Sequence, residues 1–417
     1  MKIQEYTWAN NSLLQKISTF IGTICGTSHL FITDIEEEFE LAYSEGRVYE
    51  YHSNGSSLSY FKTKYRTADE NKPIWLHMAK NMKCDKPNDY QNWKGLFAST
   101  EDELLDKLIS FDHIHASNIL FDSMSDLNYF LKQVSEKAMP EKWDYSDYKS
   151  VISFPILKSY IENTFSKLQK EFIQHKNKGL PTDRCAPIVH YKDRVYFNSG
   201  LLDRFFNQII LVTEPGTEIL NIPGFEGHVY SWYKNIKCYS HNEYEISKDF
   251  NEDDLPTLAS YFDNVEDMIF DSSLQINLND SHIFIDGLER GRIPKYREQY
   301  EHCKYDEEKK RILVNNVIKD FTAAISHVQR MAKRNYKLAV PQYWCETGEI
   351  QFLLPIYLSN SLSEDTKPQC AIALKCDNSG RIINYRGATV LTMDMAYQNA
   401  RLIAKPDTYW LKPMSNL

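Results

Sequence analysis

The sequence predicts a mixed α+β fold with largely antiparallel sheets and packed helices, preceded by a small β-rich N-terminal domain. Segments of alternating polarity are interleaved with segments of helical spacing, and several strand pairs are joined by short turns rather than by helices. Aromatic residues, which favour strands, are abundant, with 27 Tyr and 21 Phe. The chain's 417 residues exceed one usual core, so we expect two domains, at residues 1–100 and 101–417.

The first domain is expected to begin with a helix and continue as strands. The helix is predicted at 12–24, and alternating patterns predict strands at 47–51, 57–65 and 74–78. Asn54-Gly55 is typical of a tight turn between two strands. The acidic run at 36–38 is expected on a solvated face, and a helix at 101–110 is expected to lead into the second domain.

The second domain is expected to begin with helices, within 111–175, with Ser125 as an N-cap. Strands are predicted at 194–197, 208–213 and 228–239, followed by a helix at 255–270 and a strand at 273–278. A long helix is predicted at 311–334. Four strands follow it, at 338–343, 350–358, 369–376 and 381–390. Thr392 is expected to cap a last helix at 393–404.

Charge and cysteine usage exclude some classes of protein. The formal net charge of −9 disfavours non-specific coating of duplex DNA, which needs a positive field, but it allows a local basic pocket. The eight Cys contain no C-x-x-C pair, so we expect free thiols in a reducing cytoplasm and no structural zinc. The apolar stretch at 13–33 is interrupted by Lys16 and His29, so we expect neither a signal peptide nor a membrane span.

Two long segments carry a resemblance to a known family. These segments are RNYKLAVPQ at 334–342 and LTMDMAYQNARL at 391–402, with shorter matches at 197–201, at 261–263 together with 267–269, and at 350–355. In these segments, and in their order from about residue 122 to 411, the chain resembles the family called domain of unknown function 3825. Relatives in this family occur beside cold-shock-type and other RNA-associated domains, so the resemblance implies work on RNA or nucleotides by association. The chain departs from the family pattern at Ser281 and Gly287, which puts a catalytic role of the neighbouring His282 in doubt.

The segment after the long helix is the first candidate binding site. Arg334, Asn335 and Lys337 would bring a guanidinium, an amide and an ammonium together, and Tyr336 is available to stack. Such a set suits a phosphate with its attached base or ribose. The alternative is that the cations complement the end of the helix and Asn335 acts as a left-handed cap.

The last helix and two preceding strands hold further candidates. Asp394, Arg401 and Lys405 share one helical face with Gln398, and Asn399 is adjacent. The alternative is that the two charges near the helix ends only complement the helix dipole. Gln342 and Gln351 lie on successive predicted strands, so their amides pair internally or face a polar pocket. Asn198 either lines the same pocket or shapes a turn.

Histidines give the weaker candidates. His282 with Asp280 has the pattern of a general base and its orienting acid, and His113 with His115 could hold a metal ion, although such short patterns often arise by chance. We therefore predict no metal site. The motifs of common NTPases, dinucleotide enzymes, esterases and metalloproteases are absent from the sequence, so no cofactor is assigned.

These patterns predict an RNA- or nucleotide-binding protein whose pocket lies in the C-terminal domain. The predicted ligand residues are Arg334, Asn335, Lys337, Gln342, Gln351, Asp394, Asn399 and Arg401. One alternative is an enzyme that acts on a phosphodiester or nucleotide, and another is a protein-interaction scaffold. A polar pocket where the long helix end meets the last helix would favour the first two hypotheses, and a flat apolar patch the third.

Overall fold

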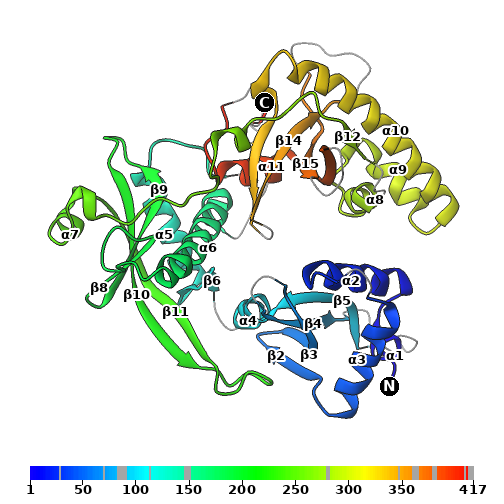
Figure 1. The fold of residues 1–417 in the computed structure, drawn as a ribbon, viewed down its shortest axis with the longest axis horizontal. Coiled ribbons are helices and arrows are strands. Elements are labelled where there is room, and N and C mark those ends of the chain that lie inside the picture. The colour runs from blue at the N-terminus through cyan, green and yellow to red at the C-terminus, as the bar shows by residue number, and fades with distance from the viewer. Residues whose placement is uncertain are drawn as a thin grey trace. The chain divides into compact units, whose positions relative to one another are not determined.

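The structure, a computed structural model, describes residues 1–27, 30–68, 71–81, 92–111, 114–144, 152–278, 282–345, 348–358, 366–377, 383–407 and 410–411. It divides into two compact units (Figure 1). Unit 1 comprises residues 1–127 and 213–236, and unit 2 comprises residues 128–212 and 237–417. The predicted domain boundary after residue 100 therefore falls within unit 1.

Unit 1 contains a five-stranded sheet in the order β1-β5-β4-β3-β2. Its strands are β1 (Thr7–Trp8), β2 (Tyr49–Ser53), β3 (Ser56–Arg66), β4 (Pro73–Lys80) and β5 (Trp93–Thr100). The predicted turn joins β2 to β3, with Asn54 at φ 47° and Gly55 at φ 77°. Both residues tolerate the left-handed region that a two-residue hairpin requires, which explains why this turn was predictable.

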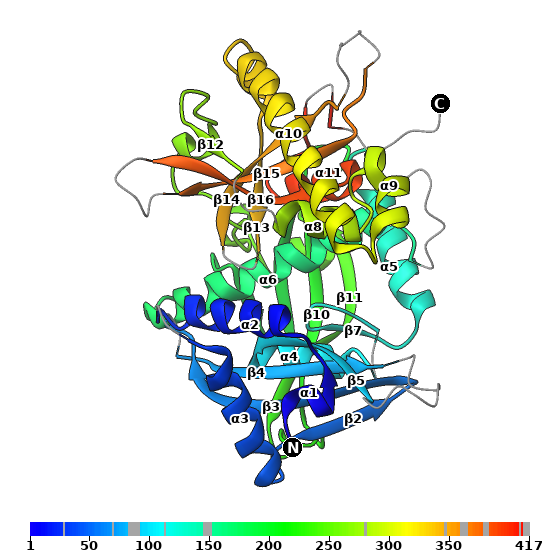
Figure 2. The same cartoon turned by 90° about the vertical axis from the view of Figure 1, so that its right-hand side faces the viewer.

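Helices cover one face of this sheet. They are α1 (Ile3–Tyr6), α2 (Asn11–Ile24) and α3 (Ile32–Ser44), and α2 and α3 lie beside the sheet in both views (Figures 1 and 2). Helix α3 contains the acidic run that was expected to be solvated. That expectation is wrong for Glu38, which is buried and accepts a hydrogen bond from the backbone N–H of Lys64 at 2.9 Å. The Lys64 ammonium lies 3.0 Å from the same carboxylate, so a strand partner compensates the buried charge.

The other face of the sheet packs against α4 (Glu101–Ile109) and the tip of a long hairpin. The hairpin is formed by β10 (Gln208–Ile219) and β11 (Val229–Ser240), which belong to a six-stranded sheet in the order β6-β7-β11-β10-β9-β8. The remaining strands are β6 (Ile114–Ala116), β7 (Ile119–Phe121), β8 (Ile188–Tyr191) and β9 (Arg194–Leu202). The prediction of helix throughout 111–175 is wrong at β6 and β7, because three-residue strands are too short to show a period.

Two helices follow β7 along the chain. They are α5 (Met124–Lys137), most of which belongs to unit 2, and α6 (Pro155–Asn177). The cap of α5 was misplaced in the sequence analysis. The Ser123 hydroxyl, rather than Ser125, accepts a hydrogen bond from the Asp126 N–H at 3.2 Å. Pro155 lies in the first turn of α6. An N–H group at this position would have no helical acceptor, so the lack of one in proline costs no helical hydrogen bond.

The predicted helix at 255–270 is wrong. The structure has only the short 3-10 turns η1 (Glu252–Asp254) and η2 (Val265–Met268) near this segment. Here the backbone bonds to other parts of unit 2, since Thr257 N–H donates to Ala186 O at 3.0 Å and Pro256 O accepts from Asn198 Nδ2 at 3.3 Å. Leu258, Val265 and Ile269, which contributed to the apolar spacing, are more than half exposed, so this spacing marks no buried helical face.

The C-terminal part of unit 2 is a five-stranded sheet in the order β12-β16-β15-β14-β13. Its strands are β12 (Ile276–Asn277), β13 (Val340–Trp344), β14 (Glu349–Ile356), β15 (Cys370–Asp377) and β16 (Asn384–Leu391). The surrounding helices and turns are α7 (Tyr244–Ser247), α8 (His282–Glu289), η3 (Pro294–Tyr296), α9 (Arg297–Cys303), α10 (Glu307–Ala332), η4 (Tyr336–Leu338) and α11 (Met393–Arg401). The long helix, the four strands after it and the last helix are confirmed, including the Thr392 cap, whose hydroxyl accepts from Met395 N–H at 3.3 Å.

The predicted mixed α+β class is confirmed. Most strand pairs are antiparallel, and the parallel ones are β1 with β5, β7 with β11, and β12 with β16. Within the described ranges, none of the helices combines the length and the apolar character that crossing a bilayer requires.

Candidate nucleotide-binding site

The segment that connects α10 to β13 is exposed. Arg334 donates from Nη1 to Arg330 O at 2.9 Å, so its guanidinium closes the end of α10. Asn335 is not the left-handed cap considered above, because its φ is −144°. Its side-chain oxygen instead accepts from the Lys337 N–H at 3.1 Å and caps η4. These bonds leave the Tyr336 ring, which is 72% exposed, and the Lys337 ammonium facing outward.

Arg401 occupies a different environment, in the interior of unit 2. Its guanidinium donates to both oxygens of Glu141, from Nε at 2.6 Å and from Nη2 at 3.0 Å. The same cation lies over the rings of Trp143 and Tyr160, with Cζ at 4.9 and 4.7 Å from their centroids. Burial raises the pKa of Tyr160, which keeps its phenol protonated and able to donate to Ser199 O at 2.9 Å. The Arg401 guanidinium is thus held by contacts with groups of the protein itself, namely Glu141, Trp143 and Tyr160.

Three of the predicted amides form a short chain of hydrogen bonds beneath α11. Asn399 Nδ2 donates to Gln342 Oε1 at 3.1 Å, and Gln342 Nε2 donates to Gln351 Oε1 at 2.9 Å. Gln342 and Gln351 are directly opposite one another on β13 and β14, and both are buried. Their amides therefore pair internally, which is the first of the two interpretations left open by the sequence. Asp394 lies in the first turn of α11, where a carboxylate complements the helix N-terminus.

Asn198 likewise bonds within the fold. Its Nδ2 donates to Pro256 O and to Gln208 Oε1, and its Oδ1 accepts from Gly200 N–H at 3.0 Å. Gly200 has φ +73°, and a Cβ there would lie 2.6 Å from the Tyr160 hydroxyl. Asn198 therefore shapes an irregular stretch of β9 and does not line a pocket together with the other candidate residues.

A pocket of about 260 Å³ lies where η4 and the start of β13 meet the end of α11. From the sequence we expect a polar pocket at this junction, whereas the pocket found there is not mainly polar. Its walls are mainly apolar, and it is lined by Met268, Tyr336, Lys337, Ala339, Val340, Pro341, Ala400, Ile403, Ala404, Lys405, Pro406 and Asp407. We call it the α11 pocket. Of the eight predicted ligand residues, only Lys337 is among its lining residues.

Two cations and one anion lie at the mouth of the α11 pocket. Lys337, Lys405 and Asp407 are all exposed. In the part of the chain that the structure describes, neither ammonium forms an ion pair. The spacing of the last helix had placed Lys405 on one face with Asp394 and Arg401. Met268 lies in one of the shorter family matches but was not a predicted ligand residue, and no sequence pattern marked Asp407. Met268 comes from the segment that was wrongly predicted as a helix.

The structure describes only some of the candidate residues that involve histidine. Asp280 and His113 lie outside the described residues, and His282 begins α8 without a described side chain. His115 Nδ1 lies 2.9 Å from Ser117 O, within its own turn. Among the described residues, no group of three His, Cys, Asp or Glu side chains is arranged to hold a metal ion.

The family model for a domain of unknown function, DUF3825, matches residues 134–410, which is well over half of the chain. The chain belongs to this family. No curated protein and no solved structure matches it. The DUF3825 match includes the α11 pocket and both members of the Glu141–Arg401 pair. The resemblance in the two long motifs is therefore confirmed.

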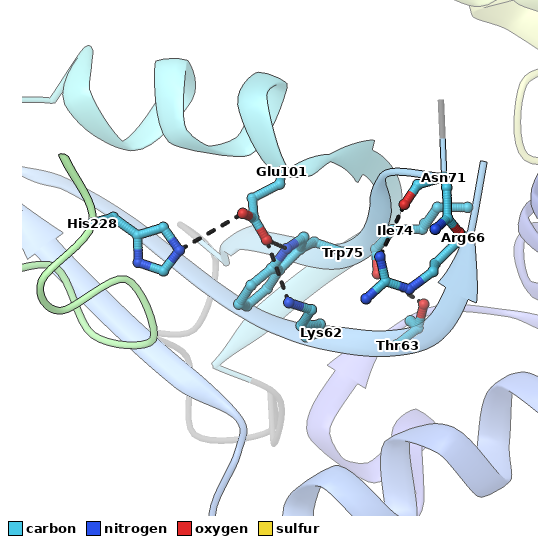
Figure 3. Close-up of polar contacts among 8 residues, drawn as sticks. All are labelled: Lys62, Thr63, Arg66, Asn71, Ile74, Trp75, Glu101 and His228. Carbon is cyan, nitrogen blue, oxygen red and sulfur yellow. Dashed lines mark hydrogen bonds and ion pairs between the residues drawn. The ribbon is translucent and has the colours of Figure 1, made fainter. Parts of the chain in front are cut away.

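A separate polar cluster lies in unit 1, mostly before the DUF3825 match. Glu101, at the start of α4, accepts a hydrogen bond from Trp75 Nε1 at 3.2 Å and lies 3.5 Å from Lys62 Nζ (Figure 3). His228, just before β11, places Nε2 3.7 Å from the other Glu101 oxygen. The Trp75 ring also stacks on Phe225, with centroids 4.6 Å apart. These contacts connect the hairpin tip to the five-stranded sheet of unit 1.

Proposed function

We propose that the DUF3825 domain of this chain binds a nucleotide unit, free or at an end of single-stranded RNA, in the α11 pocket. The proposal rests on one observation. Two ammonium groups that form no ion pair within the described residues lie at the mouth of one pocket together with an exposed aromatic ring. Each part of that arrangement matches a part of a nucleotide.

The phosphate is matched by Lys337 and Lys405. Both ammoniums lie at the pocket mouth, and an ammonium on a flexible stem is a point charge that follows a phosphate without requiring one fixed geometry. The formal charge of the whole chain, −9, does not oppose this, since charges farther apart than about 8–10 Å are largely screened at physiological salt.

The base is matched by Tyr336 and by the apolar floor. A base stacked on an aromatic ring gains roughly 1–3 kcal/mol, and every base has a π-face that can stack. Ala339, Val340 and Ile403 provide apolar surface against which the other side of a base or ribose can be buried. The pocket's volume of about 260 Å³ is slightly below the usual range of about 300–1,000 Å³ for ligand sites, which suits one nucleotide unit better than a longer segment.

The lining favours binding over turnover. Among the described lining residues, Asp407 is the one carboxylate, and no His or Cys accompanies it. General acid–base chemistry on a phosphodiester uses positioned groups with suitably shifted pKa values, so the enzyme alternative lacks a candidate pair in this pocket.

Thermal-shift titration with AMP, UMP and a short 5′-phosphorylated RNA tests the proposal. A ligand that binds only the folded state stabilises it by about 2.7 kcal/mol at 100 times its Kd, so the melting temperature should rise with concentration. The rise should be lost in the double variant Lys337→Gln/Lys405→Gln and kept in Lys333→Gln, which removes an exposed ammonium outside the pocket lining. No shift of the wild type, or equal shifts in all three proteins, would contradict the proposal.

A further inference from the structure

Among the described residues, the apolar lining of the α11 pocket has no side chain that can form a hydrogen bond with the edge of a base. It is built from Ala, Val, Pro, Ile and Met side chains, none of which donates or accepts a conventional hydrogen bond. Bases are distinguished by hydrogen bonds between their edges and the side chains of Arg, Lys, Asn and Gln, and, at cytosine, of Asp and Glu. Of these residue types, the described lining contains only Lys337, Lys405 and Asp407, the exposed groups at the mouth where the phosphate is proposed to bind.

The two side-chain amides nearest the pocket are hydrogen-bonded to each other. Asn399 precedes the lining residue Ala400, and Gln342 follows the lining residue Pro341. However, Asn399 Nδ2 and Gln342 Oε1 are 3.1 Å apart and hydrogen-bonded, and Gln342 is fully buried. Turning either amide toward a ligand would leave its present partner unpaired in the interior, which is costly.

The charged side chains at the pocket mouth can distinguish ligands by their charge. Lys337 and Lys405 attract an anion, whereas Asp407 repels it. Resting on the proposed nucleotide binding, we infer that the α11 pocket recognises a phosphate by charge and a base by its flat face, without selecting which base is bound. The ligand class is then any nucleoside monophosphate or the terminal nucleotide of an RNA of any sequence.

Isothermal titration calorimetry of the full chain with AMP, GMP, CMP, UMP and adenosine tests this inference. The four nucleotides should bind with Kd values within about threefold of one another, because stacking is nearly independent of sequence. Adenosine should bind at least about tenfold more weakly, because it lacks the charge-assisted contacts to the two ammoniums.

Two variants with opposite expected signs complete the test. Lys337→Gln should weaken AMP binding by about tenfold, and Asp407→Asn should strengthen it by about two- to threefold, since the first removes an attraction and the second a repulsion. Neither change should alter adenosine binding. Both side chains are exposed, so both variants should fold as the wild type does.

The outcomes separate this inference from the proposed function. A preference of more than tenfold for one base would overturn base-independent recognition while leaving nucleotide binding intact. Equal affinity for adenosine and AMP would overturn recognition by charge, again leaving a nucleoside site. If none of the five ligands binds, both the inference and the proposed function fail.

Discussion

Arg401 and Glu141 form a bidentate ion pair inside unit 2, with donor–acceptor distances of 2.6 and 3.0 Å. Their side chains are only 10% and 6% exposed, although 260 positions separate them in the sequence. Tyr397 also donates to Glu141, at 3.1 Å. The pair joins α11 to the segment before α6. An arginine in one of the two long motifs that carry the family resemblance is thus paired in the interior of unit 2, whereas residues 403–407, just after it, line the α11 pocket.

Arg401→Met should destabilise unit 2 by about 3–5 kcal/mol, because it leaves the Glu141 carboxylate buried without its counter-charge. Adding Glu141→Gln should recover much of the loss, since the double variant contains no unpaired buried charge. Urea denaturation followed by circular dichroism measures both changes. A single variant as stable as the wild type would show that the pair contributes little to the fold.

Gln342→Met should cost about 2 kcal/mol or more, because it leaves Asn399 Nδ2 and Gln351 Oε1 without their present partner. The matched control is Gln174→Met on the exposed side of α6, which should change the stability by no more than about 0.5 kcal/mol. Thermal denaturation of the two variants side by side is the measurement. Equal melting temperatures would mean that the buried amides do not depend on one another.

Phe225→Ala should detach the hairpin tip from the five-stranded sheet of unit 1. Phe225 is fully buried and stacks on Trp75, so its loss should cost about 3–5 kcal/mol. Phe205→Ala removes the same ring from a position that is 82% exposed and should be nearly neutral. Increased proteolysis within residues 213–236 in the first variant alone would confirm the contact, and identical digestion patterns would argue against it.

His77 should make unit 1 sensitive to acid. Burial lowers the pKa of His77 to about 3, with a smaller contribution from Lys107, whereas an unfolded histidine titrates near 6.5. The unfolded state therefore binds the proton first, so the stability contributed by neutral His77 is complete above pH 6.5. It declines by about 1.4 kcal/mol per pH unit between pH 6.5 and about 3.

The difference in unfolding free energy between wild type and His77→Gln isolates this effect. It should be constant above pH 7 and fall as the pH decreases from 6.5 to 4. Taking a difference is needed because Asp106 acts in the opposite direction: burial raises its pKa to about 6, so its protonation stabilises the fold as the pH falls. A difference that does not vary with pH would show that His77 titrates normally in the folded protein.

The fold was predictable where local chemistry and the final structure agree. Asn54-Gly55 requires positive φ at both residues, and Thr392 precedes an apolar helical pattern, so each identifies its element without knowledge of distant contacts. β7 was missed because it is stabilised by pairing with β11, where Ile119 lies opposite Tyr233. The segment at 255–270 was misassigned because its backbone bonds to residues far along the chain.

The candidate site was predictable in position and only partly in composition. The basic stretch at 334–337 and the spacing of the last helix indicated where two elements meet, and the α11 pocket lies there. The sequence could not indicate which polar side chains turn inward. Arg401 and Gln342 were equal candidates with Lys337 until Glu141 and Asn399 were found to be their partners.

Affinity labelling with periodate-oxidised AMP tests the central claim most directly. Its ribose dialdehyde forms imines with nearby lysine amines, and borohydride reduction makes the adduct permanent, so mass mapping of peptides identifies the lysine beside the bound nucleotide. The account predicts adducts at Lys337 or Lys405, suppressed by excess AMP and absent from the double variant Lys337→Gln/Lys405→Gln. Labelling spread over many surface lysines, or concentrated on a lysine outside the α11 pocket, would contradict it.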